Sequence, residues 1–119
     1  MQATKLDAFT IAYITAAIWS SVDDDGKPLD ADHDDSDLAP EALAAMVADC
    51  EAFQRDHAAD LEGLDVDQCG QDFWLTRNGH GAGFWDRGYG QLGDKLSKAS
   101  EVYGECNLYV DDDGSVRIM

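Results

Sequence analysis

The residues of this sequence best suited to do chemistry are closely spaced aspartates between Val22 and Ala39. In an extended segment, alternate aspartates such as Asp30, Asp32 and Asp34 project from one side about 6.6 Å apart, twice the strand rise. Negative charges at such intervals suit a groove that is built for a nucleic-acid backbone. The segment predicts an acidic loop that binds a cationic surface through Asp23, Asp24, Asp25, Asp30, Asp32, Asp34, Asp35 and Asp37.

A second row of carboxylates lies on a predicted amphipathic helix from Pro40 to about Leu61. Proline suits the first turn of a helix, and apolar residues recur there with helical spacing. At about 100° per residue, four acids fall inside one arc roughly 100° wide. This carboxylate stripe consists of Glu41, Asp49, Asp56 and Asp60.

The acids from Asp30 to Glu41 also match part of an EF-hand calcium loop. Position 6 of that loop needs glycine for a sharp turn but holds Asp35, and Pro40 precedes the glutamate that would bind calcium at position 12. We therefore expect no metal and no cofactor.

A glycine-rich stretch at Gly79, Gly81 and Gly83 resembles a phosphate-binding loop. Such a loop must open a helix, whereas here an aromatic segment with strand character follows, so the pattern favours a turn. His80 at its tip could act as a general base, but no Ser or Cys nucleophile is suitably spaced. A small hydrolase centred on His80 is the weakest alternative, and we expect no enzyme.

Three cysteines, Cys50, Cys69 and Cys106, lie far apart and form no Cys-x-x-Cys pair. Neither a disulfide framework nor a zinc site follows from this spacing, and buried free thiols are expected.

The first residues lack the basic region of a signal peptide, and no stretch is apolar enough to cross a bilayer. The prediction is a cytoplasmic protein.

The elements that must position these residues begin with a helix from Lys5 to Ser20. Its two apolar faces, which contain Phe9 and Ile14 respectively, are typical of a buried central helix. Docking of one face on a second copy or on a partner is the alternative. A third helix is predicted from about Asp94 to Tyr103 and ends before Gly104.

Two β-hairpins complete the predicted fold. The first pairs Phe73, Trp74 and Leu75 with a return strand from Ala82 to Trp85, and its aromatics are expected in the core. The second pairs a strand from Asn107 to Val110 with one from Val116 to Met119. The fold class is thus α+β, with helices on one face of a short antiparallel sheet built from two hairpins. We expect a single domain over residues 1–119, divided into an acidic helical part (about 1–67) and a hairpin–helix–hairpin part (about 68–119).

Charge limits the classes of partner. The chain of 119 residues has 25 acidic and 8 basic residues, a formal net charge of −17. Direct binding to nucleic acids or anionic membranes is disfavoured, because both need Lys and Arg. Through Asp67 there are 17 acidic and 3 basic residues, against 8 and 5 in the rest. This concentration favours a cationic partner over a general adaptation to high salt, which is the other interpretation.

The segment QDFWLTRNGHGAGFWDRG at residues 71–88, with GDKL at 93–96 and NLYVDDDGSV at 107–116, resembles a family of short acidic proteins from bacteriophages and other mobile elements. The resemblance covers about the last 50 residues. It implies a mobile-element context and transfers no catalytic residue, since that family has no settled activity.

Charge and context together give the leading hypothesis. It is a non-enzymatic phage-type inhibitor that mimics nucleic acid, as anti-restriction and anti-CRISPR proteins do. Its partner would be a cationic host protein or complex that normally binds DNA or RNA. The alternative is a structural or assembly accessory that forms a homodimer through the first helix.

Overall fold

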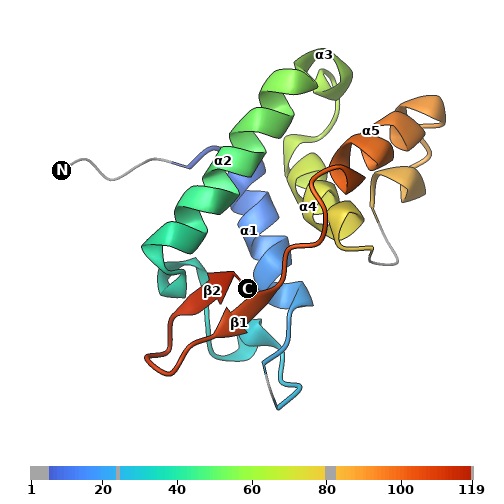
Figure 1. Cartoon of the computed structure of the whole chain (residues 1–119). Helices are drawn as coiled ribbons and strands as arrows, with labels where there is room; N and C mark the ends of the chain where they lie inside the picture. Colours follow the sequence, from blue (N-terminus) through green and yellow to red (C-terminus); the bar gives the residue numbers. More distant parts are fainter. Residues whose placement is uncertain (1–5, 24, 80–82, 119) are drawn as a thin grey trace.

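The computed structural model describes residues 6–23, 25–79 and 83–118 (Figure 1). The described residues form helices and one small antiparallel sheet, which agrees with an α+β class. The helices are α1 (Ala8–Ser20), α2 (Pro40–Asp56), α3 (Ala58–Leu61), α4 (Val66–Arg77) and α5 (Gln91–Glu101), and the strands are β1 (Leu108–Val110) and β2 (Val116–Ile118).

Helix α1 occupies the centre of the fold, between α2 and α4 (Figure 1). Asp7 begins it by accepting a hydrogen bond from the Thr10 backbone N–H at 2.8 Å, which satisfies one free amide of the first turn. Most side chains that follow are buried, as the two apolar faces predict. The exposed residues of this helix are Ala8, Ile11, Thr15 and Trp19, with 51% of Ile11 and 46% of Trp19 accessible.

The core joins both halves of the chain through aromatic side chains. Phe53 on α2 stacks on Phe73 on α4 with ring centroids 4.2 Å apart, and Tyr13 on α1 lies 5.1 Å from the same ring. Trp74 is buried, and its indole N–H donates to the Ser20 hydroxyl at 2.8 Å. The core position expected for Phe73, Trp74 and Phe84 is confirmed, whereas half of Trp85 is exposed.

The predicted first hairpin is wrong, because Phe73, Trp74 and Leu75 belong to helix α4. This helix is buried on nearly every side between α1 and α5, so its apolar residues run consecutively, as in a buried strand. Asp65 starts it by accepting a hydrogen bond from the Gln68 backbone N–H at 3.0 Å. The expected turn and return strand fall partly on residues 80–82, which lie outside the described residues, and Phe84–Asp86 form a 3₁₀ turn.

The second hairpin is confirmed, with Leu108 opposite Ile118 and Val110 opposite Val116. Its strands are short, and the helices pack mainly on one another instead of covering one face of a sheet. The predicted helix from Pro40 to Leu61 is divided, because α2 ends at Asp56 and the short α3 follows after His57.

The contact between α1 and α4 depends on Gly70. A Cβ at this position would lie 2.2 Å from the Phe9 carbonyl oxygen and 2.9 Å from the Ala12 Cβ, closer than atoms can approach. Gly to Ala normally stabilises a helix by up to about 1 kcal/mol. We predict the opposite sign for Gly70→Ala, a loss of about 2–3 kcal/mol in the free energy of unfolding, measured by urea denaturation. A stabilised variant would show that the two helices are further apart.

Candidate functional site

The acidic segment, residues 22–39, is irregular and folds around its own hydrogen bonds. It contains two 3₁₀ turns, Leu29–Ala31 and Asp35–Asp37. A bridge between Val22 and Pro28 closes its first loop, where the Asp23 carboxylate accepts from the backbone N–H groups of Asp25 and Lys27, both at 2.9 Å. Asp24 lies outside the described residues.

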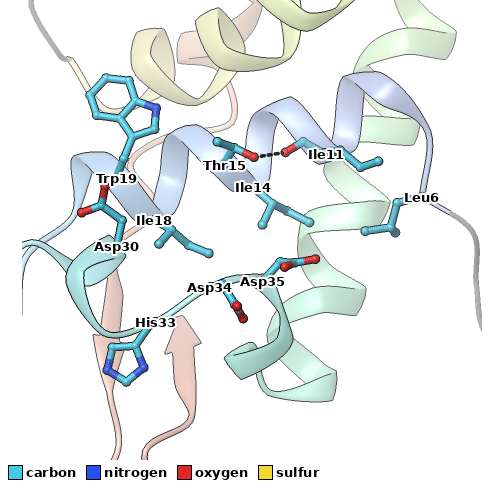
Figure 2. A pocket seen from close by; sticks show the side chains of 10 residues that line it. All are labelled: Leu6, Ile11, Ile14, Thr15, Ile18, Trp19, Asp30, His33, Asp34 and Asp35. Atoms are coloured by element: carbon cyan, nitrogen blue, oxygen red, sulfur yellow. Dashed lines mark hydrogen bonds between the residues drawn. The ribbon is translucent and has the colours of Figure 1, made fainter.

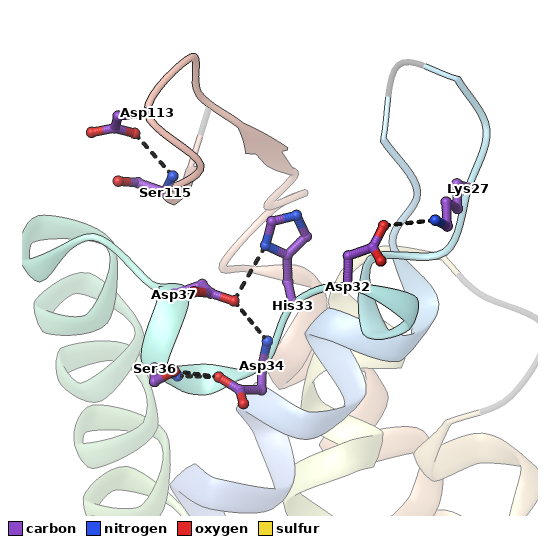
Figure 3. Close-up of polar contacts among 8 residues, drawn as sticks. All are labelled: Lys27, Asp32, His33, Asp34, Ser36, Asp37, Asp113 and Ser115. Atoms are coloured by element: carbon purple, nitrogen blue, oxygen red, sulfur yellow. Dashed lines mark hydrogen bonds and ion pairs between the residues drawn. The ribbon is translucent and has the colours of Figure 1, made fainter.

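Hydrogen bonds also order the second half of the acidic segment (Figure 3). Asp34 accepts from the Ser36 backbone N–H at 2.9 Å, and Asp37 accepts from the Asp34 N–H at 3.1 Å. His33 Nδ1 lies 3.2 Å from Asp37. The hydrogen bonds from Ser36 lower the pKa of Asp34, and the ammonium of Lys27, 2.7 Å from Asp32, lowers the pKa of Asp32. These two acids are therefore held in their charged form.

The acidic segment is anchored to the rest of the fold at its C-terminal end. Leu38 forms a parallel bridge with Val116 of β2, and the Ala39 backbone N–H donates to the Val116 carbonyl oxygen at 2.9 Å. Leu29 and Leu38 are buried, whereas most of the acids are exposed. The exposed acids of the described segment are Asp25, Asp30, Asp32, Asp34 and Asp35.

The carboxylate stripe has a different environment, because cations from the C-terminal part pair with three of its four acids. Asp60 lies 2.9 Å from Lys95, and Glu41 pairs with Arg117. Asp49 contacts the Arg77 guanidinium at 2.9 Å. Asp56 pairs with its neighbour Arg55 at 3.3 Å. The structure thus separates the two acid sets: the stripe joins α2 and α3 to the later elements, and most acids of the acidic segment are exposed.

Arg77 is buried, with 5% of its side chain exposed. Besides Asp49, its guanidinium donates to the Tyr13 hydroxyl at 2.9 Å and to the carbonyl oxygens of Tyr103 and Gly104 at 2.9 and 2.8 Å. Burial raises the pKa of Tyr13, so this hydroxyl stays protonated and offers its oxygen to Arg77. The network ties α1, α2 and α4 to the chain that follows α5.

The motif at residues 71–88 also has a structural role. Asp72 is fully buried and receives the Arg87 guanidinium at 2.8 Å, while Thr76 Oγ1 accepts from the Phe84 backbone N–H at 3.1 Å. Asn78 accepts from the Cys106 N–H at 2.7 Å. These contacts hold the segments around Phe84 and Cys106 against α4. The sequence alone offered no mechanism for this motif, and His80 lies outside the described residues.

A groove runs between α1 and the acidic segment, with a volume of about 400 Å³ (Figure 2). Ile11, Ile14 and Ile18 supply its apolar floor, and Trp19, 46% exposed, stands at one end. Asp30, Asp34 and Asp35 of the acidic segment line the opposite side. The sequence predicted these acids but not their position beside exposed apolar side chains, although it identified the apolar faces of α1.

Metal and thiol chemistry find little support among the described residues. Within residues 6–23, 25–79 and 83–118, no group of three or more His, Cys, Asp or Glu side chains is placed to hold a metal ion. The cysteines are buried free thiols, as predicted. Burial raises the pKa of Cys69 to about 11 and also raises the pKa of Cys50 and Cys106, so none is a thiolate at neutral pH.

Comparisons of the chain with protein-family models, with curated proteins and with solved structures found no match. Among the helices that the structure describes, none has both the length and the apolar character needed to cross a bilayer.

Two aspartates of the carboxylate stripe test whether the pair with the buried Arg77 contributes more to stability than an exposed pair does. Asp49→Asn should lower the free energy of unfolding by about 1–2 kcal/mol, because it leaves the buried Arg77 charge with a weaker partner. Asp56→Asn removes only an exposed pair with Arg55 and should cost less than about 0.5 kcal/mol. Urea unfolding of both variants measures the difference, and equal losses would contradict the assigned role of Arg77.

Proposed function

We propose that this protein is a non-enzymatic, phage-type inhibitor that acts in the cytoplasm as an acidic mimic of nucleic acid. The acidic segment occupies the cationic surface with which a host protein or complex binds DNA or RNA. Defence complexes of the restriction or CRISPR type are the partners that the hypothesis favours.

One observation carries the proposal, which is the division of the acids into paired and outward-facing sets. The carboxylates of Glu41, Asp49 and Asp60 are paired with cations of the same chain. In the acidic segment, exposed aspartates outnumber the single basic residue, Lys27. Uncompensated charge on an ordered surface steers an oppositely charged partner and raises its association rate. We therefore propose the five exposed acids of this segment as the residues that contact the partner.

The test uses capture and competition. Immobilised protein is incubated with a bacterial lysate at low salt, and bound proteins are eluted with duplex DNA, with RNA or with salt. We expect release of a nucleic-acid-binding protein by one of the nucleic acids, and inhibition of that protein's nucleic-acid binding once it is purified. Affinity should fall steeply as salt rises.

A pair of charge-matched variants separates a specific surface from general acidity. The test variant carries Asn at Asp25, Asp30, Asp32, Asp34 and Asp35. The control carries amides at five exposed acids outside the acidic segment, namely Glu51, Glu62, Glu101, Glu105 and Asp112. Each variant loses five of the net 17 negative charges. The proposal requires that only the first variant loses inhibition, and it is wrong if both weaken equally or if no nucleic-acid-binding protein is captured.

The alternative function, an assembly accessory that forms a homodimer, is favoured by a separate observation. Ile11 and Trp19 leave one face of α1 partly apolar and exposed. Light scattering across a range of protein and salt concentrations tests it. A dimer that persists at low protein concentration and does not respond to salt would support this function over the mimic.

A further inference from the structure

The groove beside α1 differs from the rest of the acidic surface because it combines apolar and charged walls. Ile11, Thr15 and Trp19 recur every four residues, so they form one exposed row along the helix. At 1.5 Å per residue the row is about 12 Å long, two helical turns. In Figure 2, Leu6 lies at one end and Trp19 with Asp30 at the other, while Asp35 faces Ile14.

This combination of an apolar wall and an acidic wall suits an arginine side chain. A surface that only mimics phosphate groups would need the carboxylates but not the apolar wall. Arginine has an apolar stem and a planar cationic head, so it lies along apolar surface while its guanidinium reaches a carboxylate. The exposed Trp19 ring can also attract the guanidinium through its π face. Asp30, Asp34 and Asp35 supply carboxylates on the facing wall. Thr15 adds no free donor to the groove, since its hydroxyl bonds the Ile11 carbonyl at 2.8 Å.

Charge selects among the occupants that an apolar groove could accept. A second copy of this chain would bring its own net charge of −17 and its own Asp30, Asp34 and Asp35 against the same acids. Like charges brought together at an interface cost several kcal/mol. A cationic protein segment has the complementary charge.

We propose that this groove receives an arginine-bearing amphipathic helix of the partner, with arginine stems and aliphatic side chains on the row of Ile11, Thr15 and Trp19. A helix fits because rows spaced by four residues on two helices interdigitate when they pack. Trp19 makes the largest apolar contact, at one end of the row, and Asp30, Asp34 and Asp35 hold the guanidinium groups. The inference rests on the proposed function and adds to its charge contacts an apolar contact, which salt does not screen.

The test uses a defined probe, a helical peptide of four Ala-Ala-Arg-Leu repeats with blocked ends. Its matched control carries citrulline, the neutral isostere, in place of arginine. Calorimetric titration of the full chain should show saturable one-to-one binding of the arginine peptide and none of the citrulline peptide. Trp19→Ala should weaken binding about tenfold, by loss of the apolar and cation–π contacts. The triple change of Asp30, Asp34 and Asp35 to Asn should weaken it at least as much.

Matched controls distinguish the effect of the groove from the effects of net charge and of unfolding. Trp85→Ala removes a similarly exposed tryptophan, and Glu51→Gln with Glu101→Gln and Asp112→Asn removes three exposed acids elsewhere. Both should stay within about twofold of the parent chain, well below the tenfold step. Ile11→Ser, at the other end of the row, repeats the test if Trp19→Ala unfolds.

Two results would overturn the inference. One is unchanged peptide affinity in folded Trp19→Ala and Ile11→Ser. The other is a dimer of the parent chain that Trp19→Ala dissociates, since the groove would then hold a second copy. The proposed function has its own result: if nucleic acid still releases a captured protein while Trp19→Ala has no effect, the mimic stands and only the groove inference fails.

Discussion

The buried guanidinium of Arg77 is the interaction on which the rest of the fold depends. A charge removed from water is stable only when its hydrogen bonds are satisfied and an opposite charge is near. Arg77 meets both conditions, with a carboxylate from α2, a hydroxyl from α1 and two carbonyl oxygens from the chain after α5. Its position fixes how three helices meet. It also explains why Asp49 is part of the structural framework.

Ion pairs within the chain offset part of its negative charge. From the sequence, the acids of 22–39 and those of the second helix form one large negative region. In the fold, three acids of the second set pair with cations of the same chain, namely Asp49 with Arg77, Asp60 with Lys95 and Glu41 with Arg117. Among the described residues, the acidic segment then holds the densest run of exposed carboxylates. A partner that recognises this protein would meet a compact acidic surface with an apolar groove along one border.

Periodicity predicted those parts of the fold whose burial is one-sided. Helix α2 has one apolar face, and its start at Pro40 was predicted to the residue. The second hairpin has a turn at Asp111–Gly114 between two short β segments, and it was also predicted. Helix α4 was missed because Phe73, Trp74 and Leu75 are all buried, which removes the helical period. The N-cap Asp65, followed by Gln68 three positions later, was the available signal.

Only the negative charge of the candidate site could be predicted from the sequence. The aspartates of 22–39 follow from the sequence, but the groove needs α1 and this segment to lie side by side, and no local pattern encodes that contact. The exposure of Trp19 likewise depends on which side of α1 the neighbouring helices cover. The pairing of the stripe acids required contacts between residues as distant as Glu41 and Arg117.

The bridge between Leu38 and Val116 has a consequence for synthesis. Residues 22–39 leave the ribosome long before β2 exists, so the contacts of Leu38 and Ala39 with Val116 cannot form while the segment emerges. Closing so long a loop is among the slower steps in the folding of a small domain. During translation, the acidic segment therefore has its local hydrogen bonds available but lacks the strand that anchors its C-terminal end. The wall of the groove that lies opposite α1 is fixed at this end only after residue 116 has emerged.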